Sequence, residues 1–148
     1  MKRIETWYVY YGDDFWDTKF EKTFTTMKKE WKKTHPNWTN KEIYLDYLHN
    51  KHFCKIGITR NLSQRERSLY YSEGTIVHKY IEFKGTYAQA LKIESDLRFA
   101  IEQAYPSNAI HRGNDHFYCI TIPTLKYIYN RFDEWVNESI KITKVERV

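Results

Sequence analysis

The chain has 148 residues, with 24 Lys and Arg against 19 Asp and Glu, which gives a formal net charge of +5. This length is typical of one compact domain and excludes a second full domain as the default organisation. Two cysteines exclude a disulfide framework and a four-thiolate zinc site. No stretch approaches the roughly 20 apolar residues of a membrane-spanning helix. We therefore expect a basic cytoplasmic protein with no membrane partner.

The N-terminal region predicts a strand. Residues 6–11 (TWYVYY) are β-branched or aromatic and precede Gly12, a pattern typical of a strand that ends in a turn. Further along, Thr39 and Glu42 have the spacing of a helix capping box. The residues that follow, 43–48, fit either a helix or a strand.

Between these two signals the sequence predicts a basic amphipathic helix. Thr18 and Glu21 form a first capping box, and apolar residues recur behind it at helical spacing. The opposite face includes Lys28 and Lys32, which can follow a nucleic-acid backbone, although such a stripe is more often simply solvated. We expect residues 13–50 to be a helical insertion in one domain that spans residues 1–148.

The rest of the chain predicts strands that alternate with helices. The strands are expected at residues 52–59, 75–83 and 116–122, and the helices at residues 62–71, at residues 86–105 and after Pro123. This order predicts an α/β (α+β) fold: a small, mainly antiparallel sheet flanked by helices, with the N-terminal helices as an elaboration.

The helix at residues 86–105 carries a carboxylate at an apolar position. Its predicted stripe is Tyr87, Ala90, Leu91, Leu97, Ile101 and Ala104, and Glu94 falls within that stripe. A buried carboxylate needs a cation, a metal ion or a cleft that holds water. Helical geometry alone slightly favours a buried ion pair with an arginine, or an edge of the stripe that reaches solvent, over a functional role.

A second informative run is KIGITRNLSQR, from Lys55 to Arg65. It predicts a strand that stops near Gly57 and a turn that caps a helix with Arg65 about one turn inside. Lys55, Arg65 and the neighbouring Arg60 and Arg67 can together hold a phosphodiester, because guanidinium groups match phosphate geometry. With a carboxylate for a divalent cation and nearby phenols, these residues indicate phosphoryl chemistry.

At this point the sequence resembles the GIY-YIG endonuclease superfamily. The matches to its second signature, a Tyr-Ile-Gly strand followed by Thr-x-Asn-Leu-x-x-Arg, are Ile56, Gly57, Thr59, Asn61, Leu62 and Arg65. The Ala- and Leu-rich helix around Glu94 is similar to the later block in which a Glu ligates the catalytic metal. Residues 114–118 (NDHFY) are similar to the strand that closes the domain in a phage-associated branch, whose setting would be the host cytoplasm.

The resemblance implies a metal-dependent DNA endonuclease that uses Mg²⁺ or Mn²⁺. In the family a Tyr positions and deprotonates the attacking water, an Arg neutralises phosphate charge, and a Glu holds one divalent ion. Carried over, the Arg is Arg65 and the metal ligand is Glu94. The Tyr is Tyr10 or Tyr44, with Tyr10 favoured because it lies in the stronger strand.

This sequence departs from the family pattern at Lys55, which stands where the second signature has a Tyr. A Lys beside a phosphate supplies charge but no phenol, so reduced or lost cleavage is an alternative prediction. The protein would then be a catalytically inactive binder of nucleic acid or protein, with a role in phage–host competition as one possibility. Neither a protein partner nor an oligomer is excluded.

Weaker signals lie elsewhere in the chain. Asn114 and His116, with His111, are expected in a loop rather than at a zinc site. This loop would border the cleft of the expected active site and contact nucleic acid. Tyr70 and Tyr71 can stack on bases, although such pairs more often pack within the protein.

Overall fold

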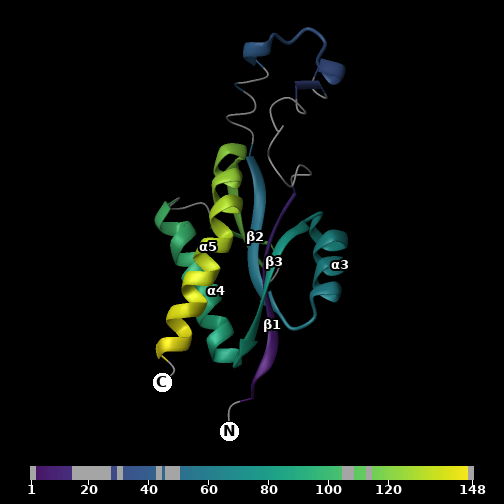
Figure 1. Ribbon diagram of the computed structural model, residues 1–148. Coiled ribbons are helices and arrows are strands. Elements are labelled where there is room, and N and C mark those ends of the chain that lie inside the picture. The colour runs from purple at the N-terminus through teal and green to yellow at the C-terminus, as the bar shows by residue number, and fades with distance from the viewer. Residues whose placement is uncertain are drawn as a thin grey trace.

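The computed structural model describes residues 3–14, 28–29, 32–42, 45, 51–104, 109–112 and 115–146. Its strands form one sheet with helices on both faces (Figure 1). In chain order the elements are β1 (Glu5–Asp13), β2 (Lys51–Thr59), α3 (Leu62–Glu73), β3 (Ile76–Gly85), α4 (Tyr87–Ala104), β4 (Ala109–Arg112), β5 (Asp115–Thr121) and α5 (Ile122–Glu146).

The sheet has five strands in the order β3-β1-β2-β5-β4, and every neighbouring pair is antiparallel. β1 lies between β2 and β3, so that Tyr10 is opposite Gly57 on one side and Tyr80 on the other. The expectation of a small antiparallel sheet flanked by helices in an α+β fold is confirmed. The predicted strands and helices after residue 51 are present within a few residues of their expected bounds.

The alternation of side chains along β1 divides the interior into two parts. Trp7, Val9 and Tyr11 face the larger core, which α4 and α5 cover. Tyr10 faces the other way and packs with Leu69 of α3. Figure 1 shows α3 on one side of the sheet and the other two helices on the opposite side. No helix among the described residues is long and apolar enough to span a membrane.

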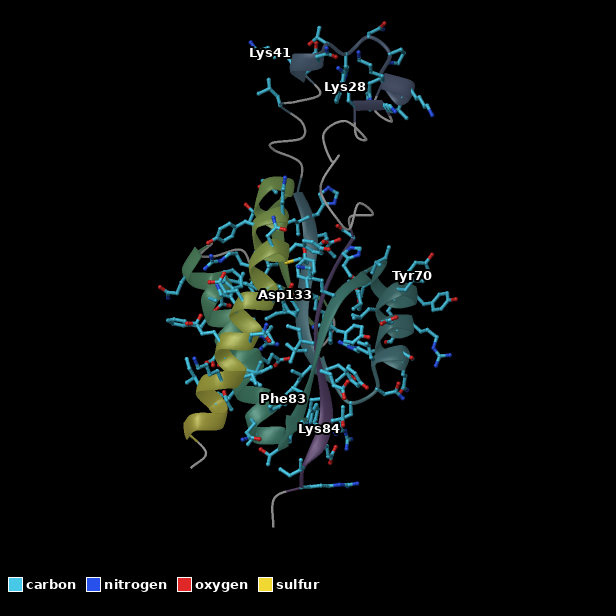
Figure 2. All side chains as sticks on the ribbon, viewed as in Figure 1. Lys28, Lys41, Tyr70, Phe83, Lys84 and Asp133 are labelled. Atoms are coloured by element: carbon cyan, nitrogen blue, oxygen red, sulfur yellow. The ribbon has the colours of Figure 1, made fainter. Side chains whose placement is uncertain are left out.

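The chain between β1 and β2 contains described helical residues at 28–29, 32–34, 40–42 and 45. The capping box predicted at residue 39 is confirmed: the Glu42 amide donates to Oγ1 of Thr39 at 3.2 Å, and the Thr39 amide donates to Oε1 of Glu42 at 3.4 Å. Lys28 and Lys41 lie beyond one end of the sheet (Figure 2). The first predicted capping box, at Thr18 and Glu21, lies outside the described residues.

The prediction of the apolar stripe on α4 is wrong at two of its residues. The buried residues are Ala90, Ile93, Leu97 and Ile101, whereas Tyr87 is 59% exposed and Leu91 is 41% exposed. The reason is that α4 is covered by α5 as well as by the sheet, which draws the buried stripe towards Ile93. Tyr87 instead stacks on Trp7 at the start of the helix, with ring centroids 5.4 Å apart.

The prediction that His111 and His116 lie in a loop is also wrong. Residues 109–112 form β4, and the register pairs His111 with His116 and Arg112 with Asp115. Two residues, Gly-Asn, therefore join the strands, and this dipeptide is typical of short hairpin connections. β4 has too few residues for an alternation of apolar and polar side chains to identify it as a strand from the sequence.

Asp13 ties the end of β1 to β3 in the interior. The Tyr11 hydroxyl donates to Oδ2 of Asp13 at 2.6 Å, and Nε2 of His78 lies 2.7 Å from Oδ1. The Asp13 and His78 side chains are fully buried. Asp13 is opposite Ile76 in the ladder, which brings His78, two residues further on, alongside the carboxylate.

We expect Asp13→Ala to lower the free energy of unfolding by about 3–5 kcal/mol, because Tyr11 and His78 would stay buried after losing this acceptor. Asp133→Ala is the matched control. Asp133 is paired with Lys79 at 3.3 Å but its side chain is 58% exposed, so its loss should change stability by no more than about 1 kcal/mol. Urea unfolding measures both, and equal losses would contradict the importance of the buried carboxylate.

Candidate functional site

The phenol of Tyr10 and the guanidinium of Arg65 meet on the α3 side of the sheet. Nε of Arg65 donates to the Tyr10 hydroxyl at 3.1 Å. A Cβ atom added to Gly57 would lie 2.5 Å from that hydroxyl and 2.7 Å from the ring carbon that bears it. The ring of Tyr10 therefore lies directly over the backbone of Gly57, in space that any other residue would fill.

The turn between β2 and α3 places Arg65. Oγ1 of Thr59 accepts from the Asn61 amide at 3.1 Å, and the Asn61 side chain accepts from the Gln64 amide at 3.1 Å as the N-cap. These bonds start the helix at Leu62, so Arg65 falls in its first turn and points back towards β1. The predicted capping turn is confirmed.

Lys55 lies on the same side of the sheet as this pair. It precedes Gly57 by two residues on β2, so the two positions share a face, and it is opposite Gly12 of β1. Its side chain is only 4% exposed. The α3 face of the sheet thus carries a phenol and two cationic groups from three segments of the chain.

Glu94 lies on α4, which covers the other face. Its side chain is 18% exposed and pairs with Arg98 one turn later at 3.5 Å. The ion pair with an arginine that helical geometry favoured is therefore present. The pair is loose and is not fully buried, since the Arg98 side chain is 36% exposed.

The flank of α4 that carries Glu94 faces β5 rather than α5. On this flank the Tyr118 hydroxyl of β5 donates to Glu102 at 3.4 Å. Burial first, and then the charge of Glu102, raise the pKa of Tyr118, while Arg98 lowers it. On the opposite flank, Asp96 accepts from Ser139 of α5 at 2.7 Å. Glu94 therefore lies towards the β2–β5 side of the sheet.

One edge of β2 lies between α3 and α4, and over part of its length it has no partner strand among the described residues. In the described part of the chain, β5 pairs with β2 only from Lys51 to Cys54. From Lys55 to Thr59, β2 pairs with β1 alone. A ligand at this edge would meet the Tyr10 face on one side and the Glu94 flank of α4 on the other. The resemblance implies that Tyr10, Arg65 and Glu94 act on one ligand, and this convergence is a prediction.

The other predicted contact residues are dispersed. Arg60 pairs with Glu5 at 2.8 Å and lies over the Trp7 ring at 5.7 Å, and Arg67 is exposed on α3. Lys28 and Lys32 belong to the segment between β1 and β2, and Lys28 lies beyond one end of the sheet (Figure 2). Tyr44 and Asn114 lie outside the described residues, and His116 is described only as part of β5.

The described residues include no group of three or more His, Cys, Asp or Glu side chains that could hold a metal ion. Glu94 would therefore supply a single carboxylate. Mg²⁺ commonly binds through one or two carboxylates together with substrate phosphates and water, so one carboxylate at a nucleic-acid site fits such an ion.

Comparisons of the chain with protein-family models, curated proteins and solved structures found no match. The interpretation of this site therefore rests on its own chemistry. Sequence patterns did not identify the burial of Lys55 or the pairing of Asp13 with His78, since both depend on the register of distant strands.

We expect Gly57→Ala to cost about 1–3 kcal/mol of stability, because its methyl group would displace the Tyr10 ring. In a Tyr10→Leu background, which removes the phenol, the same change should cost less than about 1 kcal/mol. Gly74→Ala is the control: its cost comes from the positive φ of 67° and should be equal in both backgrounds. Equal costs for Gly57→Ala would contradict the contact.

Cys54 is a core residue and not a nucleophile. Its side chain is fully buried, and burial, with smaller effects of Asp13 and Asp14, raises the pKa of its thiol well above 9.0. Burial and the charge of Asp13 likewise raise the pKa of Tyr11 well above 10.0. Both groups keep their protons in the folded state at a pH where an exposed thiol or phenol ionises.

Stability should therefore fall as the pH rises above about 9. The unfolded chain releases these protons near their ordinary pKa values, so the folded state binds more protons and the free energy of unfolding decreases with pH. The decline begins near pH 9.0 for Cys54 and near 10.0 for Tyr11. Denaturant unfolding from about pH 7 to 11 measures it, and Cys54→Ala should flatten the first part. A constant stability would overturn this assignment.

Proposed function

We propose that this protein is a nuclease of the GIY-YIG type, which hydrolyses DNA phosphodiester bonds with the help of a divalent cation. The observation that carries the proposal is the hydrogen bond of Arg65 to Tyr10 over Gly57. It joins a phenol and a phosphate-binding group in the order of the GIY-YIG signatures. The net charge of +5 favours a polyanionic partner.

In this proposal Arg65 neutralises charge that develops on the scissile phosphate. Tyr10, whose hydroxyl is held by Arg65, orients the attacking water and takes up its proton. Lys55, on the same face of the sheet, adds a positive charge near the phosphate. The DNA backbone would lie along the part of β2 that pairs with β1 alone, where Lys55 to Gly57 are buried and Ile58 and Thr59 are half-buried.

Glu94 would hold Mg²⁺ or Mn²⁺ jointly with DNA phosphate oxygens and water. When bound, the cation acts as a Lewis acid on the phosphate and its leaving oxygen. Its competitor in the free protein is Arg98, at 3.5 Å in a partly exposed pair. Such pairs contribute about 1 kcal/mol or less, so Glu94 can exchange this partner for a cation.

The decisive experiment is nicking of supercoiled DNA in Mg²⁺ or Mn²⁺. Glu94→Ala should lower the rate at least about 100-fold and change stability by no more than about 1 kcal/mol, because the Arg98 pair is weak. Asp96→Ala is the matched control, since Asp96 lies on the opposite flank of the same helix. An active Glu94→Ala protein would overturn the metal role.

A second candidate function is nucleic-acid binding without cleavage. The observation that favours it is the burial of Tyr10, which is 1% exposed. A phenol that water reaches poorly is a weak general base, and a Lys holds phosphate without removing a proton. This candidate expects DNA affinity that falls steeply with salt and intact DNA in both cations. Lys55→Tyr is then the substitution that should restore nicking.

A further inference from the structure

A pocket of about 260 Å³ lies between the end of α3 and the start of β3. Its lining includes Glu66, Arg67, Tyr70, Tyr71, Thr75 and Val77. Pockets for drug-sized ligands begin near about 300 Å³, so this one suits a single ring system. Val77 also packs against the small core that contains Tyr10, which makes the pocket a neighbour of the proposed site.

Two tyrosine rings are presented at this pocket. Tyr70 is 47% exposed and Tyr71 is 80% exposed. Their rings are perpendicular, with centroids 5.2 Å apart, and the more exposed Tyr71 ring can present a face to a planar ligand. Figure 2 shows Tyr70 directed outward from α3. Exposed rings of this size are typical of surfaces that stack on nucleobases.

The pocket also offers polar groups that an apolar ligand would leave unused. The Thr75 side chain is fully buried, and its hydroxyl has no hydrogen-bond partner in the described residues. Glu66 can accept from an N–H on the pairing edge of a base, either the exocyclic amino group of cytosine or the N3–H of thymine. Arg67 supplies a cation for a phosphate. An apolar peptide side chain would match the rings but none of these groups.

We propose that this pocket holds one unstacked nucleobase of a bound single strand, an inference that rests on the proposed nucleic-acid function. By helical spacing, Arg65 and Tyr70 lie on opposite flanks of α3, with Arg67 and Tyr71 between them on the outer face. A single strand of nucleic acid bound at Arg65 would cross the outer face of α3, which is about 10–12 Å wide. It would then place a base in the pocket. Along this path over α3, the arginines supply positive charge and the tyrosines supply rings for stacking.

The test compares two single strands of about 12 nucleotides, one oligothymidine and one abasic strand of the same length. Wild-type protein should bind oligothymidine about 5- to 100-fold more tightly than the abasic strand. Tyr71→Ala should remove that difference and leave abasic binding unchanged. Thr75→Val should reduce the difference without lowering thermal stability, because the hydroxyl it removes has no partner. Phe99→Ala, a 65% exposed ring on α4, is the matched control.

The outcomes separate this inference from the proposed function. If oligothymidine and the abasic strand bind equally well, with Arg65→Ala weakening both, the base pocket is wrong and the phosphate site stands. If neither strand binds to wild-type protein at low salt, both are wrong. If Phe99→Ala removes the difference as fully as Tyr71→Ala does, the stacking site is not at α3, and the inference is overturned.

Discussion

Tyr10 can lie across β2 only because residue 57 has no side chain. This absence lets the phenol reach Arg65, and so it connects β1, β2 and α3 through one ring. Leu69 is the only fully buried residue of α3 in the described chain. The helix therefore meets the sheet through a small cluster of Tyr10 and Leu69, against which Phe53, Leu62 and Val77 pack. The contact with Tyr10 fixes where the guanidinium of Arg65 is presented.

Local signals in the sequence were sufficient for the elements that surround this contact. The alternating aromatic residues of β1 and the capping residues Asn61 and Thr39 act within a few positions of the chain, so they determine strand and helix starts on their own. The Gly57 position was also identified by its place in the signature. Its physical reason, the ring of a residue 47 positions earlier, became apparent only in the folded chain.

Features that depend on distant segments were not predicted. Asp13 and His78 are paired because β1 and β3 share a register, and nothing near either residue indicates that partner. The buried stripe of α4 was misplaced because a helical pattern does not say how many neighbours cover the helix. Covered by α5 as well as the sheet, α4 buries Ile93 and exposes Leu91. Glu94 consequently lies at the flank of the stripe, within reach of solvent.

In the proposed function, Lys55 would decide whether the site favours catalysis or binding. A residue accelerates a reaction only when it stabilises the transition state more than the bound substrate. A lysine beside a phosphate attracts its charge in both states, so it strengthens binding more than it increases the rate. A tyrosine there would add a second phenol, which can exchange a proton with water as the bond breaks. Because Lys55 is almost fully buried, its charge is costly to maintain away from water. In the proposed function, a bound phosphate would add a further partner for that charge.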